Sequence, residues 1–190
     1  MCGVVQMKII KSIKNSVGLC LLLAAFNVSA LDVESFNKIA NDTIKQMNSG
    51  VVGDIDTLIA MQEQLMVLGV EGGVEFLQEG PKDARALILV IENAEKMKEL
   101  SLDEIEDLWH AGNYLKGQGI DPENIDHFGP TMSLMDSVIH PATSYLLIKE
   151  YKKTGDAELL ARVKGELFEV LEHIKHVKPT SGSPERVALD

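Results

Sequence analysis

The side chains best suited to chemistry in this chain are its five histidines, which all lie from His110 onward. His173 and His176 each follow a glutamate by four residues, Glu169 and Glu172 respectively. Because residues four apart share one side of a helix, all four fall on the side opposite the apolar stripe. Imidazole beside carboxylate can hold zinc, copper or nickel there. The alternative is a solvated surface near a helix end, and it is favoured because one helix offers few ligands.

A second set of candidate ligands joins His110 to Asp136 and His140. Asp136 and His140 are four residues apart, so they share one edge of a helix. A short connection would make their helix a neighbour of the one that carries His110, and His127 lies on that connection. Such a group would resemble the metal centres of helical bundles, iron included, although the Glu-x-x-His pairs of di-iron bundles are incomplete. The alternative is histidines hydrogen-bonded to local carboxylates or carbonyls.

Several other kinds of chemistry find no support in the sequence. It contains no phosphate-binding glycine loop, no nucleophile elbow and no His-Glu-x-x-His sequence. The two cysteines, Cys2 and Cys20, lie near the start of the chain, within a segment that we expect to be removed. Thiolate metal sites and disulfides are therefore not expected in the mature protein.

That segment, residues 1–30, has the three parts of a secretory signal peptide. It carries a basic start, an apolar run of ten residues from Val17 to Phe26, and the small-residue cleavage sequence Val28-Ser29-Ala30. The apolar run is too short to span a bilayer. We therefore expect an exported protein, most simply in a bacterial periplasm and alternatively outside the cell, with one domain at 31–178 and a disordered tail at 179–190.

The net charge of the chain restricts the kinds of molecule that it is expected to bind. After removal of residues 1–30, fifteen basic residues would face twenty-nine acidic ones, which gives a net charge of −14. Such a surface repels nucleic acid and anionic membranes, and it favours a cationic ligand or a protein partner. We expect no membrane-spanning segment in the mature chain. High charge also serves solubility alone.

Helical spacing of apolar residues predicts an all-α fold, an up-and-down bundle of about six helices in three antiparallel pairs. The helices are expected to begin near residues 32, 54, 81, 101, 130 and 156. The second should end near Gly69, with only a short turn before Gly80. The fourth begins with a capping box at 101–104 and should run to Gly117.

Two further features bear on the interior. The segment Leu87–Ile91 is apolar on all sides, which predicts that its helix is central. Pro141 lies inside the fifth helix and predicts a kink near Ser137 or a break at His140. The sequence favours a small exported binding protein with an acidic surface. The alternatives are a periplasmic transition-metal-binding protein that uses the histidines and, with weaker support, an enzyme with a pocket at Pro141.

Overall fold

The computed structural model describes residues 31–48 and 53–177, in which all regular structure is helical. The α-helices are α1 (Val33–Asn48), α2 (Ile55–Leu77), α3 (Ala84–Met97), α4 (Leu102–Ile105), α5 (Asn113–Gly117), α6 (Pro130–Thr154) and α7 (Ala157–Ile174). A π-helix at Glu106–His110 and a 3-10 turn at Pro122–Asn124 complete the order. The all-α prediction is confirmed. The predicted signal peptide and the tail at 179–190 lie outside the described residues.

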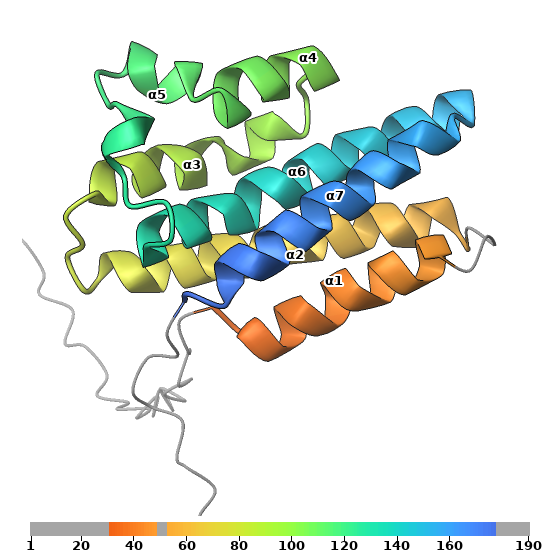
Figure 1. The fold of residues 1–190 in the computed structure, drawn as a ribbon, viewed down its shortest axis with the longest axis horizontal. Coiled ribbons are helices and arrows are strands. Elements are labelled where there is room, and N and C mark those ends of the chain that lie inside the picture. The colour runs from red at the N-terminus through yellow and green to blue at the C-terminus, as the bar shows by residue number, and fades with distance from the viewer. Residues whose placement is uncertain (1–30, 49–52, 178–190) are drawn as a thin grey trace, which may run out of the picture.

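Four long helices pack in a closed ring, in which α1 contacts α2, α2 contacts α6, α6 contacts α7 and α7 contacts α1 (Figure 1). The third helix, α3, packs against α2 and α6, and α4 also contacts α6. The helix α6 is therefore the hub of the arrangement. Within the described ranges, no helix is both long enough and apolar enough to cross a membrane.

The prediction that the helix containing Leu87–Ile91 is central was wrong. Leu87 and Val90 are buried, but Ile88 on the same helix is 38% exposed. The central helix is α6, although its sequence is more polar. Several of its buried hydroxyl groups donate to carbonyls of the preceding turn, as Ser137 does to Leu134 and Thr143 to Ile139. Short side chains that satisfy their own hydrogen bonds can be buried without partners from other helices.

The helix α2 continues past Gly69 to Leu77, so the predicted end near Gly69 was wrong. A Cβ atom on Gly69 would lie 2.5 Å from the carbonyl oxygen of Ser137 on α6, and one on Gly72 would lie 2.6 Å from Cβ of Leu31. These glycines therefore permit close packing rather than end the helix. Tertiary contact outweighs their low helix propensity.

The proline in α6 does not break the helix, which is continuous from Pro130 to Thr154. Pro141 has no amide hydrogen, so the carbonyl of Ser137, one turn earlier, lacks its usual helical donor. This is the carbonyl that Gly69 of α2 approaches. The predicted break at His140 is therefore absent, and two helices pack closely near this point; the alternative, a kink near Ser137, stays a prediction.

The segment 101–117 begins as predicted but is not one helix. The capping box is present, with Ser101 accepting from the amide of Glu104 and the Glu104 side chain accepting from the amide of Ser101. After Ile105, however, the chain forms the π-helix and then turns at Gly112, whose φ is +70°. A Cβ at Gly112 would also lie 2.5 Å from Cγ of Pro122. The backbone turn at this glycine divides the predicted helix in two.

The packing at Gly69 gives a matched pair of glycine substitutions. Gly69→Ala should lower the free energy of unfolding by about 2 kcal/mol, because the new methyl group overlaps the carbonyl of Ser137. Gly165→Ala, on α7 with open space around it, should raise that free energy by up to about 1 kcal/mol, because alanine favours helix. Denaturant unfolding of both variants measures the difference. Equal effects at the two positions would contradict the close packing of α2 on α6.

Candidate metal centre

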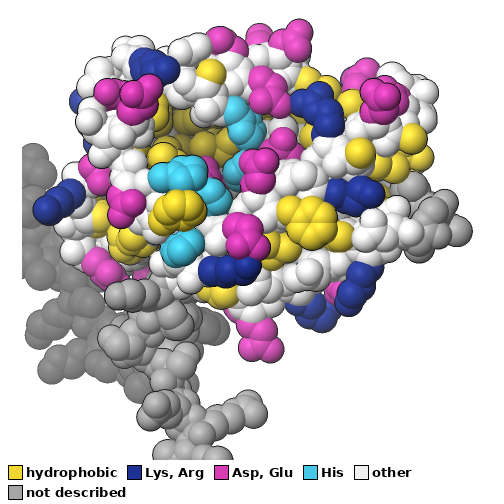
Figure 2. Space-filling view, viewed as in Figure 1, with side chains coloured by type: hydrophobic (Ala, Val, Ile, Leu, Met, Phe, Trp, Pro, Cys, Tyr) yellow, Lys and Arg dark blue, Asp and Glu magenta, His cyan; other side chains and the backbone are white. Residues whose placement is uncertain are grey.

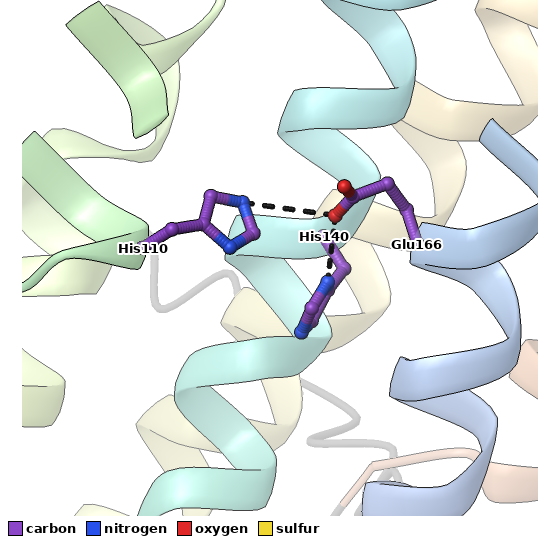
Figure 3. A group of neighbouring side chains, drawn as sticks. All are labelled: His110, His140 and Glu166. Carbon is purple, nitrogen blue, oxygen red and sulfur yellow. Dashed lines mark hydrogen bonds and ion pairs between the residues drawn. The ribbon is translucent and has the colours of Figure 1, made fainter. Parts of the chain in front are cut away.

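Three side chains from separate segments converge where α6 and α7 meet the π-helix. They are His110 at the end of the π-helix, His140 on α6 and Glu166 on α7 (Figure 3). Oε2 of Glu166 lies 2.8 Å from Nδ1 of His140 and 3.6 Å from Nε2 of His110. One ligand atom from each residue can be chosen so that all three lie within 4.8 Å of one another. His140 and Glu166 are largely buried, whereas His110 lies at the surface.

The π-helix positions His110. Its neighbour Trp109 is buried against Tyr114, with ring centroids 4.6 Å apart, and this contact anchors the segment. Nε2 of His110 lies 2.9 Å from the hydroxyl of Thr143 on α6. Because that hydroxyl donates its proton to the carbonyl of Ile139, it accepts from His110. In the metal-free arrangement His110 therefore carries its proton on Nε2.

His140 is the most buried member, with a side chain that is 7% exposed. Burial has the largest single influence on its pKa and lowers it. The hydrogen bond to Glu166 and the charges of Asp136, Glu166 and Glu169 act in the opposite direction and together prevail. The pKa of His140 is therefore raised above its ordinary value, and Nδ1–H donates to Glu166.

A second carboxylate, Asp136, lies between His140 and His173. Its Oδ2 atom is 2.8 Å from Nδ1 of His173, and its Oδ1 atom is 4.0 Å from Nε2 of His140. Within the described part of the chain, no lysine or arginine lies within ion-pair distance of Asp136 or Glu166; histidines are their ion-pair partners. Imidazoles therefore supply the compensation that a buried carboxylate needs.

The remaining two histidines extend the group to the surface. The exposed His127, on the segment before α6, has its ring centroid 4.9 Å from that of His173. The exposed His176 stands 5.1 Å, centroid to centroid, from the ring of Phe128. The histidine side chains consequently gather on one side of the molecule, with hydrophobic side chains among them (Figure 2).

His173 of the first ligand set proposed from the sequence joins the second set in one cluster. His110 and His140 approach each other as expected, and Asp136 joins His140 to His173 of the other set. The side chain of His173 is only 12% exposed and faces Asp136 on α6. The prediction of a solvated surface was therefore wrong for His173, because α7 packs against α6 here, whereas Glu169, Glu172 and His176 are exposed as that interpretation expects.

The two glutamates of the first set stay outside the cluster. Glu169 is exposed and influences His140 through its charge, whereas Glu172 pairs with Lys175. Sequence reasoning missed Glu166, which supplies the carboxylate instead. It precedes His173 by seven residues, two helical turns, so the spacing placed both on one side of α7.

No family model matches the chain, and no curated protein or solved structure matches it. The chemistry of the site therefore follows from its donors. Two imidazole nitrogens and one carboxylate oxygen are the set with which zinc is often held by three protein ligands, the fourth position remaining open. Non-haem iron(II) uses the same donor types. A metal ion would replace the protons now carried by Nε2 of His110 and Nδ1 of His140.

The His140–Glu166 pair predicts a pH dependence in metal-free protein. Since the folded-state pKa of His140 is raised, its contribution to stability is complete below the unfolded value of about 6.5 and is lost as pH rises through the folded value. Histidine NMR titration should show this raised pKa, and Glu166→Gln should lower it. Glu172→Gln, which alters the pair with Lys175 instead, should leave it unchanged. An unaltered His140 pKa in the Glu166 variant would contradict the assignment.

Proposed function

We propose that the chain is an exported helical-bundle protein that binds a transition-metal ion through His110, His140 and Glu166. The observation that carries the proposal is the convergence of three ligand atoms within 4.8 Å from three separate segments. A pair one turn apart on a single helix arises easily by chance. Convergence from the π-helix, α6 and α7 requires the tertiary fold.

The electrostatics of the site support a bound cation. Glu166 is largely buried and has only imidazoles as ion-pair partners among the described residues. A buried carboxylate is costly unless a positive charge compensates it. In metal-free protein the His140 imidazole can supply that charge when it is protonated; a divalent cation would supply it while leaving both histidines neutral.

The donor types also restrict the metal. Imidazole nitrogen with carboxylate oxygen suits zinc and iron(II) best, with nickel and copper as further candidates. Three protein ligands leave a coordination position for water or a small anion. The side chain of His110 is 23% exposed, so the ion can enter from that side. The acidic surface would raise the local concentration of cations.

The second candidate is a metal-free interaction protein, and exposed aromatic side chains support it. Phe128 beside the histidines is 59% exposed, and Phe168 on α7 is 55% exposed. Exposed aromatic side chains are common at protein interfaces. The third candidate, an enzyme with a pocket at Pro141, is less well supported, because Pro141 is buried. A hollow of about 470 Å³ lies elsewhere, beside Lys98 and Lys149.

Metal titration of protein purified without an affinity tag tests the proposal. After treatment with chelator, zinc or cobalt(II) should raise the melting temperature and bind tightly. Glu166→Gln should weaken binding at least tenfold, because it removes the carboxylate and the charge together. Glu169→Gln makes the same change three residues away on α7, at an exposed position, and should bind nearly as tightly as wild type.

Two results would contradict the proposal. Failure of zinc, cobalt, nickel, copper and iron to alter the melt would exclude a specific site. Equal loss in the two glutamine variants would show that the bound metal depends on general negative charge rather than on Glu166.

A further inference from the structure

We propose that Asp136 and His173 form a second position for a divalent transition-metal ion, so that the cluster holds two ions on either side of His140. This inference rests on the proposed function and extends it. The second position would have fewer protein ligands than the first, and we therefore expect it to bind more weakly.

The first support is the relation between His173 and Asp136. Nδ1 of His173 lies 2.8 Å from Oδ2 of Asp136, yet this buried nitrogen makes no hydrogen bond. The two atoms are close without the N–H direction that a hydrogen bond requires. Because Nδ1 makes no hydrogen bond, it and Oδ2 of Asp136 are both available to a common metal ion. Donors at about 2.1 Å from one zinc ion are roughly 3.4 Å apart at a tetrahedral angle, so a modest opening would admit the ion.

The second support is the charge balance. Asp136 and Glu166 are both largely buried, and each has histidines as its ion-pair partners in the described residues. One divalent ion at His110, His140 and Glu166 would leave Asp136 with the His173 imidazole as its nearest partner and with no metal charge of its own. A second ion at Asp136 would neutralise the carboxylate and would also bind Nδ1 of His173, which makes no hydrogen bond.

The third support is the orientation of His140 between the two carboxylates. Its Nδ1 faces Glu166 and its Nε2 faces Asp136, at 2.8 Å and 4.0 Å from the nearest oxygen respectively. With Nδ1 on the first ion, Nε2 keeps its proton and points toward Asp136. A carboxylate that orients a ligand histidine in this way is common around metal sites. Asp136 would thus orient His140 at the first site and would be a metal ligand at the second.

Water would complete the second position, and the exposed His127 lies beside it, with its ring centroid 4.9 Å from that of His173. The competing explanation is a metal-free ion pair between Asp136 and a protonated His173. The two explanations differ in the number of ions bound per chain, which can be counted directly.

Native mass spectrometry of the whole protein during cobalt(II) or zinc titration provides that count. Wild type should bind two ions per chain, the second at least tenfold more weakly than the first. His173→Gln should bind one ion. His176→Gln changes an exposed histidine three residues further along the chain, and this variant should still bind two ions. Circular dichroism checks that each variant is folded. If His173→Gln is unfolded, Asp136→Asn provides a second variant that removes a ligand of the second position.

The failures of the two proposals are distinguishable. No bound ion in wild type would overturn the proposed function and this inference together. One ion in wild type, retained in His173→Gln and lost in Glu166→Gln, would leave the first site intact and overturn the second. Two ions retained in His173→Gln would also overturn it, because the second ion would then lie elsewhere.

Discussion

Burial of two carboxylates among histidines is the constraint on which the arrangement of this protein depends. Asp136 and Glu166 lie at the contact of α6 with α7, and their ion-pair partners in the described residues are imidazoles. Buried carboxylates are costly unless compensated, so His140 and His173 must remain near them. The packing of α6 on α7 brings His140 and His173 to the two carboxylates. The position of the π-helix adds His110.

The bundle can accommodate these buried carboxylates and histidines because the central helix, α6, packs closely against a neighbouring helix. The hydroxyl groups of Ser137 and Thr143 on α6 bond to their own helix, and Gly69 lets the backbone of α2 approach Ser137 closely. Pro141 contributes by freeing the Ser137 carbonyl at that contact. The backbone of α6 thus packs closely on α2 at Ser137, while Asp136 and His140 face His173 and Glu166 of α7. Pro141 and the glycines of α2, which interrupt the helical pattern of the sequence, thus take part in the packing of these helices.

Local signals in the sequence predicted much of the fold, whereas contacts between helices decided the rest. The capping box at Ser101 and the start of α6 at Pro130 were predictable because caps and prolines act within one turn. The continuation of α2 through Gly69 was not, because it depends on α6. The proximity of His110 to His140 followed from a short connection between helices. The role of Glu166 was missed, because its partners lie on other helices and only its spacing to His173 was visible in the sequence.

The most direct test of the account is X-ray absorption spectroscopy of the protein loaded with one equivalent of zinc. We expect an inner shell of nitrogen and oxygen at about 2.0–2.2 Å, with outer-shell scattering from two imidazole rings. His110→Ala should reduce that outer shell to one ring. A spectrum with oxygen scattering alone, unchanged by His110→Ala, would show that zinc is held by surface carboxylates and water. It would contradict the assignment of the cluster as a metal centre.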